Sequence, residues 1–214
     1  MVERHCSGVI LAGGANMRFG GAPKGLSVID GRRVIDRVLD ALAGVVDERF
    51  IITNDAAIRN AVREVAAYGD ERAERGSLVG LHSALRHCRT AAVVVAWDMP
   101  FVPAALLAHL REVGERAGTA AIPIGPSGPE PLCAYYPRAV LPTVERHLDA
   151  GNLRLSHLVA TLADAVLVPA HEMARFGPPE LLFANVNTEA DLEAARARGV
   201  AAAHSTFISL AEHR

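Results

Sequence analysis

The sequence has few cysteines, no excess of charge of either sign and no long hydrophobic run. Its three cysteines, Cys6, Cys88 and Cys133, are far apart and form no C-x-x-C pair, which excludes a disulfide framework and a zinc ribbon and favours a reduced, cytoplasmic setting. Lysine and arginine number 22 and aspartate and glutamate 24, so the net charge is −2 and no overall field attracts nucleic acid or an anionic membrane. Any anionic ligand must therefore be bound by a local site.

The apolar runs are also too short for a membrane span or a secretion signal. The run at 91–97 is far shorter than the roughly 20 residues of a spanning helix. The run at 9–12 is too short for a signal-peptide core and is followed by glycines. The chain contains no H-E-x-x-H and no G-x-S-x-G motif, so neither a zinc peptidase nor a serine hydrolase of those types is indicated. With half of its 214 residues hydrophobic, the chain is expected to be soluble and unsecreted.

Short β-branched runs alternate with longer stretches of helical periodicity from end to end, which predicts an α/β fold. The expected strands are 8–12, 49–53, 91–96, 119–124, 132–136 and 165–168, with a weaker one at 181–186. The expected helices are 33–43, 56–65, 78–87, 103–116, 138–149, 153–162 and 189–198, the last with Thr188 as its N-cap and Gly199 after its end. We expect one domain over residues 1–199 and a partly disordered tail over 200–214, where the pattern is lost.

The strand at 91–96 reads A-A-V-V-V-A without alternation, which indicates a central parallel strand covered on both faces. In a doubly wound sheet of this kind, ligands bind beyond the carboxyl ends of the strands. The polar residues at those ends are Asn54, Asp98 and the pair Asn185 and Asn187. These residues are therefore the first candidates for binding and catalytic residues.

The first expected strand runs into the loop LAGGANMRFGGAPKG, whose Gly13, Gly14, Gly20 and Gly21 allow the backbone to approach a phosphate closely. Arg18 and Lys24 follow as cations that can offset the charge of a triphosphate. The spacing is neither G-x-G-x-x-G nor a Walker A loop. From the residues alone, a glycine-rich turn with two surface cations remains an alternative.

Five short motifs occur in an order that resembles the molybdenum cofactor guanylyltransferases. They are LAGG-x3-R-F-G-G-x2-K-G-L, G-S-L-x-G-L, W-D-M-P-F-V-P, E-P-L-x-A-Y-Y and N-V-N-T-x2-D-L, and they span about residues 7–196. The resemblance implies a Rossmann-like, three-layer nucleotidyltransferase fold with a mostly parallel central sheet. Two positions depart from the family pattern: Pro23 stands where Asp is usual, and Ser77 stands where Pro is usual.

The resemblance also implies the roles of individual residues. Arg18, Lys24 and Asp98 are the expected catalytic residues. The residues expected to bind GTP are Leu11, Ala12, Gly13, Gly14, Lys24, Asn54, Asp70 and Asp98. Asp98 is expected to bind Mg²⁺ with Asn187, and Arg154, Asn185 and Asn187 to face the pterin substrate or its phosphate.

Each of these roles has a simpler alternative from the residues alone. Asp98 follows a buried strand, where a carboxylate needs a cation, but it also precedes a helix as a cap or turn residue does. Asn187 fits an Asx-type turn, and Asn54 and Asp70 fit ordinary turns. Arg154 fits a solvated helix-surface arginine.

The expected reaction is the transfer of GMP from GTP to the terminal phosphate of molybdopterin or molybdenum cofactor, with release of pyrophosphate. The glycine-rich loop and Asp98 would also serve a cytidylyltransferase acting on the same pterin or a sugar-phosphate nucleotidyltransferase. A non-catalytic nucleotide-binding protein that delivers the cofactor is the alternative from another class. A molybdenum-insertion protein or a molybdoenzyme apoprotein is the expected protein partner.

Overall fold

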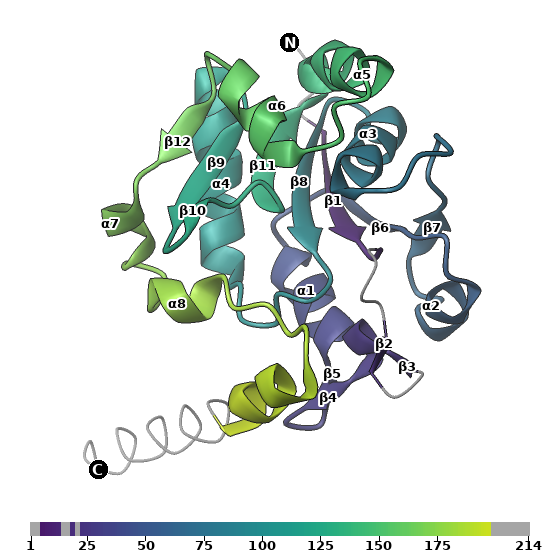
Figure 1. The fold of residues 1–214 in the computed structure, drawn as a ribbon. Coiled ribbons are helices and arrows are strands. Elements are labelled where there is room, and N and C mark those ends of the chain that lie inside the picture. The colour runs from purple at the N-terminus through teal and green to yellow at the C-terminus, as the bar shows by residue number, and fades with distance from the viewer. Residues whose placement is uncertain (1–4, 14–17, 20–21, 198–214) are drawn as a thin grey trace.

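The computed structural model describes residues 5–13, 18–19 and 22–197, and one eight-stranded sheet forms its centre (Figure 1). The strands follow the spatial order β10-β9-β11-β8-β1-β6-β7, and β12 pairs with β9 beside this path. Their bounds are Cys6–Leu11 (β1), Glu48–Ile52 (β6), Ala66–Tyr68 (β7), Ala91–Ala96 (β8), Ala121–Gly125 (β9), Gly128–Pro129 (β10), Cys133–Pro137 (β11) and Val166–Val168 (β12). Two short hairpins stand apart from the sheet: Arg18–Phe19 (β2) with Ala22–Pro23 (β3), and Val28–Ile29 (β4) with Arg32–Arg33 (β5).

The strand directions confirm a mostly parallel sheet. Strand β1 runs parallel to both of its neighbours, β6 and β8, and β6 runs parallel to β7. Strand β11 lies antiparallel between β8 and β9, and β12 is parallel to β9. Because the chain leaves β1 toward β6 on one side and returns to β8 on the other, the end of β1 is a topological switch point, where α/β proteins bind ligands.

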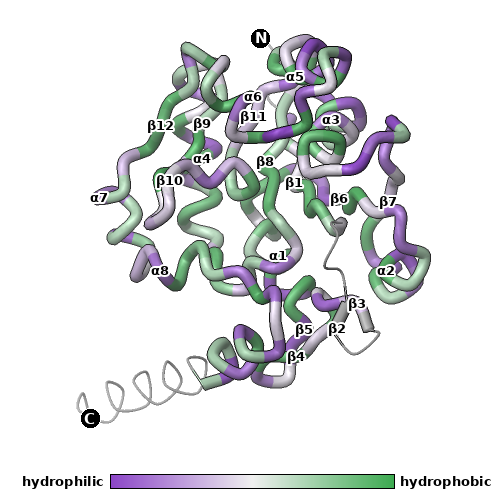
Figure 2. Tube along the Cα trace, viewed as in Figure 1, coloured by the Kyte–Doolittle hydropathy of each residue, from purple (hydrophilic) through white to green (hydrophobic). Residues whose placement is uncertain are grey.

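Helices cover both faces of the sheet. Their bounds are Val34–Leu42 (α1), Ala56–Ala61 (α2), Ser77–His87 (α3), Ala104–Ala117 (α4), Leu141–Asp149 (α5), Leu155–Thr161 (α6), Ala170–Met173 (α7) and Pro179–Leu182 (α8), with 3-10 turns at Lys24–Leu26 (η1) and Arg138–Val140 (η2) and a further helix at 189–197. Val93 and Val95 pack toward the side of α1 and α4, whereas Ala92 and Val94 pack toward α3 and α5. Figure 2 shows the resulting hydrophobic centre along β1 and β8. The chain thus folds into three layers, as expected.

Two local predictions were wrong, and the hairpin of β4 and β5 was missed. Residues 181–186 do not form a strand, because Pro179 starts the short helix α8 and the N–H of Val186 bonds to the carbonyl of Asp98 (2.9 Å) rather than to a sheet neighbour. The helix predicted at 56–65 ends at Ala61, and the unpredicted strand β7 follows it. The hairpin of β4 and β5 also was not predicted, although its Asp30-Gly31 turn has the positive φ angles, 50° and 76°, typical of a two-residue hairpin.

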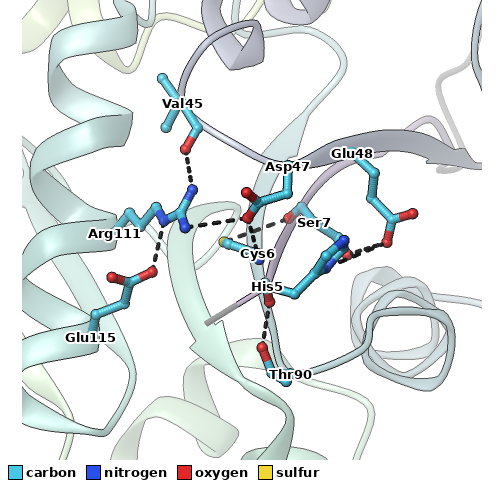
Figure 3. Close-up of polar contacts among 9 residues, drawn as sticks. All are labelled: His5, Cys6, Ser7, Val45, Asp47, Glu48, Thr90, Arg111 and Glu115. Atoms are coloured by element: carbon cyan, nitrogen blue, oxygen red, sulfur yellow. Dashed lines mark hydrogen bonds and ion pairs between the residues drawn. The ribbon is translucent and has the colours of Figure 1, made fainter. Parts of the chain in front are cut away.

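A polar network fixes the amino end of the sheet (Figure 3). The carboxylate of Asp47 accepts the backbone N–H of Cys6 (2.7 Å) and lies 3.3 Å from Arg111 Nη2. Arg111 also donates to the carbonyl of Val45 (2.6 Å) and to Glu115 (2.7 Å). These contacts tie α4 to the loop between α1 and β6 and to the first residue of β1. The start of β1 is therefore held in place at the end opposite the expected site.

The helix at 189–197 packs on the β4–β5 hairpin (Figure 1). The predicted N-cap is confirmed, because Thr188 Oγ1 accepts the N–H of Asp191 (3.1 Å). Leu192 and Ala195 are buried in a small cluster with Ile29, and Arg196 Nε donates to Val28 O (3.1 Å). Gly199 and the tail at 200–214 lie outside the described residues. None of the helices in the described ranges has the length and apolar character needed to cross a bilayer.

Candidate active site

Strands β8, β1, β6 and β7 end at one edge of the sheet, as the sequence predicted for polar residues that follow strands. Their last hydrogen bonds run across this edge, from Trp97 N to Leu11 O (3.2 Å) and from Ala12 N to Ile52 O (2.9 Å). Asp98, Gly13, Asn54 and Asp70 therefore leave the sheet on the same side. All four are residues for which a role in catalysis or GTP binding was expected.

Lys24, Asp98 and Asn187 meet at the centre of this edge, although 163 residues separate Lys24 from Asn187. Lys24 Nζ donates to Asp98 Oδ2 and to Asn187 Oδ1, both at 2.6 Å. Lys24 is 6% exposed and Asp98 8%, so this ion pair is removed from bulk water. An ammonium group has three N–H donors, and these two contacts leave one for a ligand oxygen.

Gly25 determines where Lys24 lies. A Cβ atom on Gly25 would lie 2.2 Å from Trp97 Cε3, so only glycine lets η1 approach the indole ring so closely. Trp97 is 1% exposed and directly precedes Asp98. The contact between Gly25 and Trp97 thus brings the residue before Gly25, Lys24, to the residue after Trp97, Asp98.

Asn187 is held by its own set of hydrogen bonds. The backbone of the preceding residue, Val186, donates to Asp98 O (2.9 Å), which fixes the segment beside the end of β8. The N–H groups of Asn187 and Thr188 donate to Asp191 Oδ2 at 3.0 and 2.8 Å. The hydroxyl of Thr188 and these N–H groups, with Lys24 nearby, lower the pKa of the partly buried Asp191 carboxyl. The amide of Asn187 is therefore positioned toward Lys24 by the start of the following helix.

Asn54 and Asp70 form a second cluster on the β6–β7 side of the edge. Asn54 Nδ2 donates to Asp70 Oδ2 (2.7 Å), and Asp70 N donates to Asn54 Oδ1 (2.9 Å). A Cβ on Gly69 would lie 3.1 Å from Asn54 Oδ1, which shows how closely the two loops pack. Burial raises the pKa of the Asp70 carboxyl, and the hydrogen bond from Asn54 opposes that rise. The carboxylate is thus oriented and partly desolvated.

The chain is similar to nucleotide-transferring proteins along most of its length. Residues 8–166 match the family described as the MobA-like NTP transferase domain. The molybdenum cofactor guanylyltransferase of Desulfosudis oleivorans is 36% identical over 196 residues, which are 89% of this chain and 94% of that protein. The chain belongs to the MobA-like NTP transferase family.

Two further similarities agree with this assignment. The probable molybdenum cofactor guanylyltransferase of Methanosarcina mazei is 31% identical over 87% of this chain and 88% of that protein. The crystal structure of molybdopterin-guanine dinucleotide biosynthesis protein A from Archaeoglobus fulgidus is 31% identical, covers 91% of this chain and 98% of that chain, and has a TM-score of 0.77. The expected nucleotidyltransferase fold is therefore confirmed.

In this MobA-like transferase, the first loop begins at the end of β1, and its first described glycine is exposed. Leu11 and Ala12 are buried at the end of β1, whereas Gly13 is exposed, and a Cβ on it would meet nothing within 4 Å. Gly14 lies outside the described residues. The backbone of Arg18 is in β2, and its side chain lies outside the described part of the structure. The expected roles of Gly14 and Arg18 remain predictions.

Arg154 and Asn185 do not contact Lys24 or Asp98 in the described structure. Arg154 is exposed at the start of α6. The residue before it, Leu153, lies near the start of α3, since its carbonyl oxygen would be 3.9 Å from a Cβ on Gly76. Asn185 is exposed and lines a hollow of about 490 Å³ with Glu130 and Phe183. Asn185 and Asn187, two residues apart in the motif N-V-N, therefore have different surroundings: Asn187 contacts Lys24 and Asn185 lines the hollow.

The two side-chain oxygens that accept from Lys24, Asp98 Oδ2 and Asn187 Oδ1, are also the best candidates for metal ligands in this MobA-like transferase. Within the described residues, no three acidic, histidine or cysteine side chains form a cluster able to hold a metal ion. Mg²⁺ usually takes one or two protein carboxylates and completes its shell with water and substrate phosphates. A carboxylate has about four lone-pair sites, so Asp98 can serve Lys24 and a metal ion together. Asp98 and Asn187 thus fit an ion that arrives with a nucleotide.

The sequence reasoning missed three residues that shape the site: Gly25, Trp97 and Asp191. Gly25 and Trp97 stand beside Lys24 and Asp98 in the quoted motifs, but a close contact between two distant segments leaves no periodic signal. Asp191 does have a signal. The spacing T-x-x-D is that of a capping box, with an acidic residue three positions after a threonine N-cap.

Proposed function

We propose that this protein transfers the GMP group of GTP to the terminal phosphate of molybdopterin, or of its molybdenum-loaded form, with release of pyrophosphate. The single observation that carries the proposal is the contact of the buried Lys24 with the buried Asp98 and with Asn187 at the switch point of the sheet. A reaction between two anions requires positive charge that offsets their repulsion. A loop that binds the nucleotide, a buried cation and two oxygens that can hold a metal ion meet this requirement. The names of the relatives support GTP and molybdopterin as the two substrates.

The reaction requires no protein base. A phosphate monoester has a second pKa near 6, so the attacking phosphate is largely dianionic at neutral pH. One of its oxygens forms a bond to the α-phosphorus of GTP, and the bond from that phosphorus to the bridging oxygen breaks. The electron pair of the broken bond leaves with pyrophosphate. Lys24 would stabilise the charge that develops on the phosphates, and the fold would hold the two anions in line.

We further propose Mg²⁺ as the metal, held by Asp98 and Asn187. When bound, Mg²⁺ supplies charge neutralisation at the phosphates and orients them. Asp70 would bind the guanine base. Arg154 would bind the phosphate of the second substrate, and Asn185 would contact its pterin. A molybdenum-insertion protein or a molybdoenzyme apoprotein would supply or receive the pterin.

The state of the cysteines supports a reducing, cytoplasmic setting for this reaction. Cys6, Cys88 and Cys133 are buried free thiols. Burial raises the pKa of Cys6 to about 12 and that of Cys88 to about 11, so neither is a reactive thiolate at neutral pH. A thiol nucleophile is therefore not part of the proposed mechanism.

The test is to mix the purified protein with Mg²⁺, molybdopterin and each of the four NTPs, and to measure pyrophosphate release and the dinucleotide product. We expect release with GTP that depends on molybdopterin. Faster release with CTP would identify a cytidylyltransferase, and release with a sugar phosphate in place of the pterin would identify that substrate class. Nucleotide binding without pyrophosphate release under any of these conditions would support the cofactor-delivery alternative.

A further inference from the structure

The hollow beside Asn185 contains a carboxylate that the proposed reaction has not used. The hollow lies between the β9–β10 hairpin and α8, and Glu130, Asn185 and Phe183 line it. The carbonyl of Leu132 accepts the N–H of Ala96 (2.8 Å), which places the segment after Glu130 beside the carboxyl end of β8. Glu130 is thus two residues from a segment that pairs with the strand leading to the active site.

The carboxylate of Glu130 is held close to the backbone but contacts no cation among the described residues. A Cβ on Gly125 would lie 2.6 Å from Glu130 Oε1 and 3.0 Å from Phe183 Cδ2, so both side chains pack over this glycine. The carboxyl group is partly buried, and burial alone raises its pKa. No hydrogen bond or ion pair joins it to another side chain in the described part of the chain. A ligand with two N–H donors would satisfy it.

A second hollow at the same end of the molecule lacks this property. It lies between the β4–β5 hairpin and the start of α4, and its charged side chains already pair with one another. Arg37 lies 3.2 Å from Asp30, and Arg32 forms an ion pair with Asp40. The unpaired carboxylate therefore distinguishes the hollow at Glu130.

The hollow is connected to the proposed reaction centre through one short segment. Asn187 contacts Lys24, and Asn185 lines the hollow two residues earlier. Two residues span at most about 7 Å. On the proposed function, a substrate with its phosphate at Lys24 would extend past Asn187 so that its other end lies in this neighbouring hollow.

We propose that Glu130 recognises the pterin ring of the second substrate through its 2-amino-4-oxopyrimidine edge. This inference rests on the proposed function and names a specificity residue for it. The edge presents two adjacent donors, the ring N3–H and the 2-amino group, and an ionised carboxylate accepts both. Asn185 can donate from its amide to the 4-oxo group, and Phe183 provides an apolar wall.

The experiment compares two ring systems that differ at one position. The probes are 6-hydroxymethylpterin and 6-hydroxymethyllumazine, which carries an oxygen in place of the 2-amino group. Their binding to the full chain is followed by their own fluorescence or by calorimetry. The parent protein should bind the pterin at least about tenfold more tightly, the discrimination typical of hydrogen bonds to a charged group, because the carboxylate would face the added oxygen of lumazine.

Glu130→Gln should lower the ratio of pterin to lumazine affinity by at least about tenfold, because its amide offers one acceptor and one donor, which match lumazine. The matched control is Glu180→Gln, which removes the same charge from the same hollow and should leave the ratio unchanged. GTP binding should be unchanged in both variants. Equal affinity of the parent for the two probes, including no detectable binding of either at millimolar concentration, would overturn the proposal. An unchanged ratio in Glu130→Gln, or an equal change in Glu180→Gln, would do the same.

The outcomes also separate this proposal from the proposed function. If the parent transfers GMP to molybdopterin but Glu130→Gln keeps its preference for the pterin, only the role of Glu130 is wrong. If the parent prefers the pterin through Glu130 but releases no pyrophosphate, the hollow is a pterin site and the proposed transfer is wrong.

Discussion

The two ends of the central sheet use charge in different ways. At the amino end, Asp47 and Glu115 both contact Arg111 (Figure 3), with Asp47 exposed and Arg111 and Glu115 partly buried. At the carboxyl end, Asp70 and Glu130 are partly buried and face no cation in the described residues. Each of these two carboxylates at the amino end has a cation, whereas at the carboxyl end Asp70 accepts only from the neutral amide of Asn54 and Glu130 has no side-chain donor in the described residues.

The pKa shifts of the carboxyl groups follow this division. The backbone N–H of Cys6 and then the charge of Arg111 lower the pKa of Asp47, whereas burial raises the pKa of Asp70 and Glu130. Desolvated carboxylates in a cleft are typical of functional sites, because a ligand supplies the missing partners. We therefore expect the amino end to stabilise the fold and the carboxyl end to bind the substrates of the proposed reaction.

The largest expected effect comes from removing the cation at the carboxyl end. Lys24→Ala should lower kcat/KM for GMP transfer by about 10² to 10³, the range for one preorganised charge contact in a catalytic site. Arg111→Ala removes a cation at the amino end and should lower the free energy of unfolding while leaving kcat/KM of the folded enzyme near that of the parent. Steady-state kinetics and urea unfolding of both variants are the measurements.

The contrast between these variants also tests whether Lys24 acts on the substrate. Loss of a buried ion-pair partner destabilises a protein, so Lys24→Ala must be assayed where unfolding curves show it to be folded. Turnover equal to that of the parent at limiting GTP would remove Lys24 from the site. A comparable loss of kcat/KM in folded Arg111→Ala would contradict the division between the two ends.

Asp70 should determine the choice of base, with the next largest effect. The Watson–Crick edge of guanine offers two adjacent donors to a carboxylate, whereas cytosine offers one donor beside acceptors. GTP should be preferred over CTP by about 2–3 kcal/mol, or roughly 30- to 150-fold, and Asp70→Ala should abolish most of this preference. Values of kcat/KM for both nucleotides decide the question. A variant that is less stable but keeps the parent ratio would show that Asp70 is only a turn residue.

The sequence predicted those parts of the molecule that leave a local pattern. The buried run at β8 and the periodic helices predicted the three layers, and the carboxyl ends of the strands pointed to Asp98 and Asn54. Strand β7 is too short, and α8 too dependent on Pro179, for periodicity to reveal them.

The family resemblance assigned Lys24, Asp98 and Asn187 to one site, but the residue patterns alone could not bring them together, because their meeting depends on contacts between three distant segments. The close approach of Gly25 to Trp97 is one such contact. Glu130 belongs to the motif E-P-L-x-A-Y-Y, but the residues alone did not predict a role for it, because its packing over Gly125 depends on the hairpin after β9. Chain geometry, rather than residue type, selected these groups.

A smaller effect is expected when Asp98 loses its charge but keeps its shape. Asp98→Asn retains an acceptor for Lys24 and should fold, but a neutral ligand binds a divalent cation more weakly. We expect the Mg²⁺ concentration for half-maximal transfer to rise by about tenfold or more, since bonds to charged groups are roughly twice as strong as neutral ones. Activity measured at increasing Mg²⁺ concentration gives this half-maximal value. Calorimetry in the presence of GTP measures the binding of Mn²⁺ to the parent and the variant. A Mg²⁺ dependence equal to that of the parent would show that Asp98 is not a ligand.

The smallest expected effect is on the pH dependence of the free energy of unfolding, which should have opposite signs for the carboxyl groups at the two ends. The folded-state pKa of Asp47 lies below the ordinary 3.8, so its stabilising contribution is present above that pH and is lost as pH falls through the folded pKa. The folded-state pKa of Asp70 lies above 3.8, so its contribution is present below that pH and is lost as pH rises through the folded pKa. Urea unfolding of the parent, Asp47→Asn and Asp70→Asn between about pH 2.5 and 6 tests this. The stability of Asp70→Asn relative to the parent should increase as pH rises, whereas that of Asp47→Asn should decrease. Slopes of the same sign for both variants would show that the carboxyl groups at the two ends do not differ as the structure indicates.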